Sequence, residues 1–199
     1  MTRRLLPLVL FLFATHALAE DRPTMADLQK ALALHERSVV KVRGNRKAGV
    51  GVIVGTEGQV LTSVSNVSLD TAQVEFAGQA LPAKVVLANA YLKVAVVAAP
   101  AGDYPAVPVR TATDSPVGQW LIGVVPARNR RSNDTPKAGL ARKAPAPFFD
   151  VDLALPPGSP LFDTNGRLVA VSVQRKGRGC RALPLDVVRQ QLATRVAEP

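Results

Sequence analysis

Few residues of this 199-residue sequence have side chains suited to covalent catalysis. The sequence holds one cysteine, Cys180, and two histidines, His16 and His35. Nucleophilic catalysis needs a hydroxyl or thiol activated by a base, and imidazole is the base most often used. We expect His35 to be solvated or to lie beside a helix cap. For Cys180 three interpretations stay open: a small buried apolar side chain, an intermolecular disulfide and a reactive thiol.

Positive charge is concentrated in two segments, residues 128–143 and 175–181, with one acid, Asp134, among them. The candidate binding residues are Arg128, Arg130, Arg131, Arg142, Lys143, Arg175, Lys176 and Arg178, and Lys137 and Arg181 belong to the same segments. Such cations could bind a carboxylate-rich peptide, an anionic glycan, lipid headgroups or nucleic acid. The alternative is a solvated surface that aids solubility. Neither segment holds an aromatic residue, which disfavours nucleic acid.

Residues 1–19 have the pattern of a secretory signal peptide, with a basic start at Arg3 and Arg4, an apolar core and a small-x-small end. We expect cleavage after Ala19 and a periplasmic or secreted protein. Without the leader the chain has 23 Lys and Arg against 15 Asp and Glu, which leaves a net charge of +8. No later apolar run is long enough to span a bilayer, so we expect no transmembrane anchor in the mature chain.

The first half of the mature chain predicts one helix followed by short strands. Residues 20–37 form the helical segment, and Thr24 followed by Asp27 is typical of a capping box. Runs rich in β-branched residues then predict strands at residues 38–42, 50–54, 60–61, 72–76, 83–87 and 94–98. Strands without intervening helices predict an antiparallel barrel or sandwich.

The second half begins after a linker rich in Pro and Gly. It predicts strands at residues 118–125, 148–153, 168–173 and 180–183, an irregular basic segment at 128–143 and a hairpin turn at 163–166. An amphipathic helix closes the chain at residues 185–196. The predicted organisation is a first barrel over 38–100, a linker over 101–116, a second barrel over 117–184 and a C-terminal helix and tail over 185–199.

Seven segments, in the same order, resemble the trypsin-like serine proteases of the bacterial HtrA/DegP type. They begin at Ser38, Gly49, Gly58, Leu92, Gly118, Pro157 and Ala182. The resemblance implies an all-β fold of two six-stranded antiparallel β-barrels with a short N-terminal helix and a C-terminal helix. No segment resembles the PDZ domain of the full-length family members.

The same resemblance implies that the catalytic positions have been replaced. It puts Ser65 at the general base, Lys93 at the aspartate that orients that base, and Pro157 at the nucleophile. A hydroxyl is a poor proton acceptor, and a cation does not stabilise an imidazolium. Proline has neither a nucleophilic side chain nor the backbone N–H that the oxyanion hole uses. The other oxyanion donor falls to Leu155, whose backbone is restricted by the proline that follows it.

These residues favour an exported pseudoprotease, a binding or regulatory module for an acidic protein or other anionic ligand, and they predict no cofactor and no metal site. One alternative is a weak hydrolase that uses Ser65, Ser159 or Cys180, including a dyad of Ser65 with Lys93. Another is a structural subunit of an envelope assembly. Family resemblance taken alone implies a serine endopeptidase.

Overall fold

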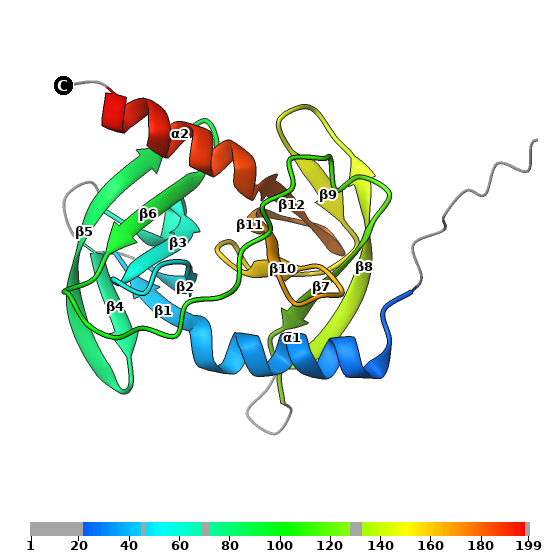
Figure 1. Cartoon of the computed structure of the whole chain (residues 1–199), viewed down its shortest axis with the longest axis horizontal. Helices are drawn as coiled ribbons and strands as arrows, with labels where there is room; N and C mark the ends of the chain where they lie inside the picture. The colour runs from blue at the N-terminus through cyan, green and yellow to red at the C-terminus, as the bar shows by residue number, and fades with distance from the viewer. Residues whose placement is uncertain (1–21, 45–46, 69–71, 128–132, 198–199) are drawn as a thin grey trace, which may run out of the picture.

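Two closed, six-stranded antiparallel β-barrels lie side by side in the computed structural model (Figure 1). The model describes residues 22–44, 47–68, 72–127 and 133–197. The predicted fold class, including a helix at each end, is confirmed. The predicted signal peptide, residues 1–19, lies outside the described residues, as do Arg128, Arg130 and Arg131.

The first barrel follows the predicted pattern of β-branched residues. Its strands are β1 Val39–Arg43, β2 Ala48–Ile53, β3 Gln59–Ser63, β4 Ala72–Phe76, β5 Gln79–Asn89 and β6 Val94–Ala98, in the closed order β1-β2-β3-β6-β5-β4. Valines such as Val42, Val60 and Val74 point inward and are fully buried. Because side chains alternate between the two faces of a strand, every second residue fills the barrel and its neighbours face outward.

The second barrel contains two strands that the sequence did not predict. Its strands are β7 Trp120–Val125, β8 Thr135–Lys143, β9 Phe149–Val151, β10 Pro160–Phe162, β11 Leu168–Lys176 and β12 Gly179–Pro184, in the closed order β10-β11-β12-β9-β8-β7. The prediction of an irregular segment over 128–143 is wrong for β8, which pairs with β7 from Trp120↔Leu140 to Val125↔Thr135. Its buried positions are the small residues Gly139 and Ala141, so the usual β-branched signal is missing.

Each helix touches both barrels. The helix α1 Met25–Ser38 runs beneath them and contacts β1, β2, β7 and β8 (Figure 1). The helix α2 Leu185–Ala197 packs on β11 and β12, and the Nδ2 group of Asn89 in β5 donates to Gln191 in α2 at 3.0 Å. Within the described residues, neither helix is long and apolar enough to cross a membrane.

A shared core and the linker hold the barrels together. Val52, Leu61 and Val96 of the first barrel belong to the same apolar cluster as Ile122, Phe162 and Leu183 of the second. The linker crosses from one barrel to the other (Figure 1). It hydrogen-bonds to both, with Val107 N donating to Ile53 O at 3.0 Å and Arg110 N donating to Leu168 O at 3.0 Å. The barrel interface is therefore a packed surface that can position residues from both halves.

Candidate functional site

The three positions that the resemblance singled out lie together where the barrels meet. Ser65 lies on the short 3-10 helix η1 Val64–Asn66, Lys93 lies just before β6, and Pro157 lies in the loop before β10. The carbonyl of Lys93 accepts hydrogen bonds from Val64 N at 3.1 Å and from Ser63 Oγ at 3.2 Å. The carbonyl of Pro157 accepts one from Asn66 Nδ2 at 3.0 Å. The fold therefore gathers these positions through their backbones.

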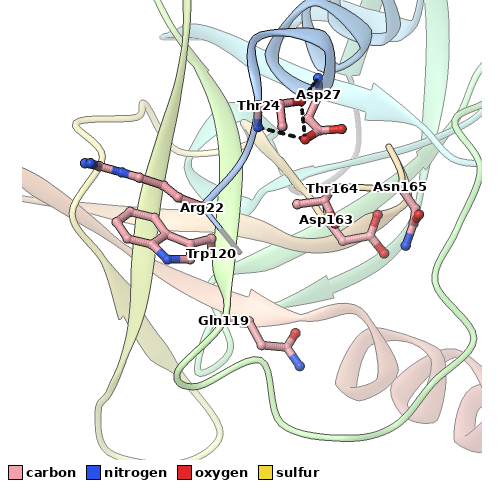
Figure 2. A pocket seen from close by; sticks show the side chains of 8 residues that line it. All are labelled: Arg22, Thr24, Asp27, Gln119, Trp120, Asp163, Thr164 and Asn165. Atoms are coloured by element: carbon pink, nitrogen blue, oxygen red, sulfur yellow. Dashed lines mark hydrogen bonds between the residues drawn. The ribbon is translucent and has the colours of Figure 1, made fainter. Parts of the chain in front are cut away.

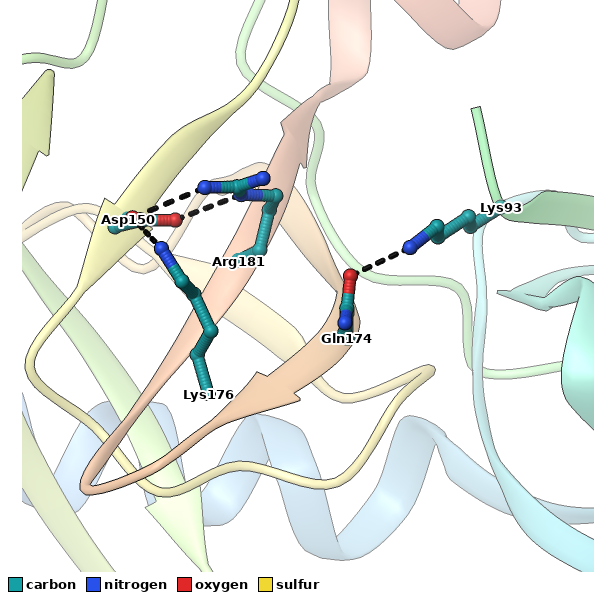
Figure 3. A network of polar contacts seen from close by, with 5 residues as sticks. All are labelled: Lys93, Asp150, Gln174, Lys176 and Arg181. Atoms are coloured by element: carbon teal, nitrogen blue, oxygen red, sulfur yellow. Dashed lines mark hydrogen bonds and ion pairs between the residues drawn. The ribbon is translucent and has the colours of Figure 1, made fainter. Parts of the chain in front are cut away.

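Their side chains do not form a proton relay. The Oγ atom of Ser65 lies 3.0 Å from Ser63 Oγ and donates to Asn66 Oδ1 at 3.3 Å. The ammonium of Lys93 instead donates to Gln174 Oε1 in β11 at 2.5 Å (Figure 3). A lysine acts as a base only when it is uncharged and within hydrogen-bond reach of the proton that it takes. This lysine is directed toward the second barrel, so Ser65 has no activating base in this arrangement.

Asn66, which the sequence did not mark as part of the site, connects the two barrels at this point. Its side chain is buried, and its Nδ2 atom lies within hydrogen-bond distance of Val50 O at 3.2 Å, Thr62 Oγ1 at 3.1 Å and Pro157 O at 3.0 Å. The only sequence signal was its position next to Ser65. Because a buried amide must have partners, Asn66 stabilises a direct contact between the loop before β10 and the first barrel.

Backbone N–H groups of that loop are bonded within the second barrel. Pro157 has no N–H. Leu155 N donates to Leu153 O at 2.8 Å, Gly158 N donates to Ser172 O at 2.6 Å, and Ser159 N donates to Pro156 O at 3.2 Å. An oxyanion hole needs donors directed at the position of the developing charge. The donors on either side of Pro157 are engaged elsewhere, so the loop offers no such pair.

The remaining candidate nucleophiles are buried. Ser159 is 2% exposed, and Cys180 is fully buried, which raises the pKa of its thiol to about 11. Cys180 therefore matches the first of its three interpretations, a small buried side chain. Of the two alternatives predicted for His35, the structure favours a place beside a helix cap over a solvated one, because the residue is half-buried and burial lowers its pKa. Its place near a helix cap is confirmed, since its carbonyl accepts the N–H of Val39.

Part of the predicted basic surface converges on one groove. Arg142 and Lys143 of β8, Lys176 of β11 and Arg178 of the β11–β12 turn line a groove of about 720 Å³, called here the basic groove. Of the other candidate binding residues, Arg175 is exposed but does not line it.

Two aspartates outside the predicted site, Asp150 and Asp152, lie among these cations. Asp150 Oδ2 lies 2.9 Å from Lys176 Nζ, and Asp150 Oδ1 lies 2.9 Å from Arg181 Nε (Figure 3). Arg142 pairs with Asp152 at 2.7 Å. Hydrogen bonds from Arg181 first, and from Lys176, hold the pKa of Asp150 below its usual value. Part of the positive charge is therefore neutralised.

A smaller cavity of about 320 Å³ lies at the start of α1 (Figure 2). The guanidinium of Arg22 lies 5.0 Å from the centre of the Trp120 ring, a cation–π distance. The two carboxylates that line this cavity already have hydrogen-bond partners. Asp27 accepts from Thr24 N, and Asp163 accepts from Arg167 N. No group of three or more His, Cys, Asp and Glu side chains within the described residues could hold a metal ion.

Comparison with known proteins agrees with this fold and places the chain in a family. Residues 49–171 match the trypsin-like peptidase domain, and the chain belongs to that family. A probable periplasmic serine endoprotease, DegP-like, from Halomonas elongata is 28% identical over 167 residues. That match covers 71% of this chain and 34% of the relative, so the chain spans about a third of the relative's length.

Solved structures show the same fold at low identity. The serine endoprotease from Yersinia pestis matches with a TM-score of 0.73 and 19% identity, over 89% of this chain and 69% of that one. An inactive mutant of the Rv3671c protease from M. tuberculosis matches with a TM-score of 0.68 and 20% identity, over 90% of this chain and 97% of that one.

Proposed function

We propose that this protein is an exported member of the trypsin-like family that has lost peptidase activity and acts as a binding or regulatory module for an anionic ligand. The observation that carries the proposal is Pro157, which the family resemblance aligns with the nucleophile and whose carbonyl accepts a hydrogen bond from Asn66 of the other barrel. Proline supplies neither a nucleophile nor a donor for the oxyanion.

The neighbouring residues support the same conclusion. Peptide hydrolysis by this family needs a base that takes the proton of the nucleophile and a carboxylate that orients the base. Ser65 carries a hydroxyl at the first position and Lys93 a cation at the second, and that cation is bonded to Gln174. A weak hydrolase built on Ser159 or Cys180 is disfavoured, because both side chains are buried.

Export is supported by the leader pattern of residues 1–19 and by the relative from Halomonas elongata, whose name places it in the periplasm. A binding role is supported by the basic groove and by the net charge of +8 after removal of the leader, which attracts acidic partners. An acidic protein is the ligand class that suits both the basic groove and the positive net charge.

The test is incubation of the purified mature chain with unfolded casein, with a competent trypsin-like protease as positive control. A matched variant carries Ser65→Ala, Ser159→Ala and Cys180→Ala, and its melting temperature checks that it folds. We expect neither protein to release fragments. Cleavage by the parent chain that disappears in the variant would contradict the proposal and identify a working nucleophile.

A further inference from the structure

The walls of the basic groove carry more positive charge than their own acids neutralise. Four cations line it, and Arg181, which does not line it, also bonds to Asp150, so five cations are set against two carboxylates, Asp150 and Asp152. Asp150 holds two of these cations and Asp152 holds one. The local excess is therefore positive, and it lies within a concave surface where solvent screening is weaker than on a convex one.

Two of the lining cations are available to a ligand. Lys143 and Arg178 are exposed, and neither has an ion-pair partner among the residues that the structure describes. Their neighbours Arg142 and Lys176 are held in place by the two aspartates. Because Arg142 and Lys176 are already held by ion pairs, these two side chains lose less conformational entropy when a ligand binds, so the groove is partly organised before binding.

The lining of the basic groove distinguishes between anionic ligands. No aromatic side chain lines it, so a nucleic acid base has no surface on which to stack. The large apolar side chains that the described chain exposes are Met25, Val86, Tyr91 and Val117, and none of them lines the groove. A membrane site of this charge would need an adjacent apolar anchor.

Part of the basic groove is lined by residues without long side chains, which leaves room for an extended chain. These residues are Val151, Gly177 and Gly179. A Cβ atom on Gly179 would lie 2.5 Å from Val151 O, so only glycine fits there, and Gly177 adopts φ +54 with open space beside it. A volume of about 720 Å³ exceeds that of a single small anion and falls in the range of pockets that hold drug-sized ligands, so the groove has room for a short stretch of peptide.

From these features we infer that the basic groove binds a carboxylate-rich peptide segment of a protein partner, with Lys143 and Arg178 pairing with its carboxylates. Asp150 and Asp152 act as positioning residues that fix the flanking cations. The inference rests on the proposed binding function and names the site and the ligand class. Charge-assisted hydrogen bonds from Arg and Lys to carboxylates supply the affinity.

The experiment measures binding of a fluorescently labelled Glu-Gly repeat peptide to the mature chain by anisotropy, beside a Gln-Gly peptide of equal length. We expect the Glu-Gly peptide to bind, the Gln-Gly peptide not to bind, and the affinity to fall as salt is raised. The double variant Lys143→Gln and Arg178→Gln is expected to lose affinity by about tenfold or more.

A second double variant, Lys137→Gln and Arg175→Gln, is the matched control. It removes the same charge from exposed residues of the two basic segments that do not line the groove. We expect its affinity to change by less than about twofold. Melting temperatures equal to that of the parent chain show that both variants fold.

Three outcomes would overturn the inference. Equal loss in the two double variants would show attraction by net charge alone. If the Glu-Gly peptide does not bind and casein is still not cleaved, the basic groove is not a peptide-binding site, but the proposed loss of peptidase activity stands. Binding of anionic vesicles, a sulfated glycan or an oligonucleotide in preference to the peptide would assign the groove to another ligand class. Cleavage of the peptide would instead contradict the proposed function.

Discussion

At Gly158 the loop before β10 approaches the backbone of β2 in the first barrel closely. Gly158 adopts φ +96, and a Cβ atom at this position would lie 1.9 Å from Val50 O in β2. Two separate requirements therefore select glycine: a left-handed backbone and the absence of a side chain. Together with Asn66, this contact presses the loop that contains Pro157 onto the first barrel.

We predict that Gly158→Ala lowers the free energy of unfolding by about 3 kcal/mol or more, because backbone strain and a steric clash with β2 add together. The control is Gly78→Ala, at φ +77 with nothing within 4 Å of the new Cβ atom. It should cost about 1 kcal/mol, from backbone strain alone. Urea unfolding measures both changes, and equal costs would show that the contact with Val50 is not tight.

The half-buried His35 is expected to make the stability of the protein depend on pH. Burial lowers its pKa below the ordinary value of 6.5, while nearby Asp134 and Glu36 act in the opposite direction. The unfolded chain then binds a proton on His35 more readily than the folded chain. The free energy of unfolding is therefore expected to be constant above about pH 7 and to fall as the pH is lowered below 6.5 toward the folded-state pKa.

Urea unfolding at several pH values between about 7.5 and 5 tests this effect, with His35→Gln as the comparison. The variant should show a flatter profile over this range. Asp150 does not interfere, because its pKa lies below its usual value of 3.8 and its contribution is lost only at more acidic pH. A slope that persists unchanged in the variant would assign the effect to other groups.

The first element that holds the barrels, α1, begins at a complete capping box. Asp27 N donates to Thr24 Oγ1 at 3.3 Å, and Thr24 N donates to Asp27 Oδ2 at 2.8 Å. We predict that Thr24→Ala destabilises the protein by about 1 kcal/mol, because the N–H of Asp27 loses the hydroxyl that accepts it and the Asp27 carboxylate loses the hydroxyl that donates to it.

The control is Thr194→Ala in α2. Its hydroxyl donates to Gln190 O within the helix, at an exposed position. Alanine has the higher helix propensity, so this variant should change stability by less than about 0.5 kcal/mol. Thermal unfolding of the two variants separates the cap from a general effect of replacing threonine, and equal destabilisation would refute the role of the cap.

Among the elements, those with a strong local signal were predicted from the sequence. The strands of the first barrel and both helices follow from β-branched runs, the capping box and the amphipathic C-terminal pattern. The strand β8 was missed because Gly139 and Ala141 take its inward positions, and a Cβ atom on Gly139 would lie 2.7 Å from Leu153. The three-residue strand β10 is too short to show a period.

The candidate site was also predictable only in part, because some of its contacts leave no local pattern in the sequence. The positions of Ser65, Lys93 and Pro157 came from ordered resemblance, and the structure brings them together. The ion pairs of Asp150 and Asp152 depend on register across β8, β9 and β12, which no local pattern reveals. In that register Asp150 lies opposite both Arg142 and Arg181.

In the molecule as a whole, the two barrels are joined by a shared apolar core, by the linker and by both helices. The positions of Ser65, Lys93 and Pro157, which the resemblance aligns with the catalytic residues, lie at this junction. At this junction Pro157 and Gly158 contact the first barrel directly, while Arg142, Lys143, Lys176 and Arg178 of the second barrel line the basic groove. The architecture is that of the trypsin-like peptidase family, and the proposed binding function places the ligand in the basic groove.

The loss of peptidase activity is tested most directly by a mass measurement. The intact mass of the folded mature chain is determined after incubation with a fluorophosphonate, which labels activated serine hydroxyls covalently. The variant Ser65→Ala is the control, and a competent trypsin-like protease shows that the reagent is active. We expect an unchanged mass for both chains. A stoichiometric adduct on the parent chain that is absent from Ser65→Ala would contradict it and show that a catalytic serine has been retained.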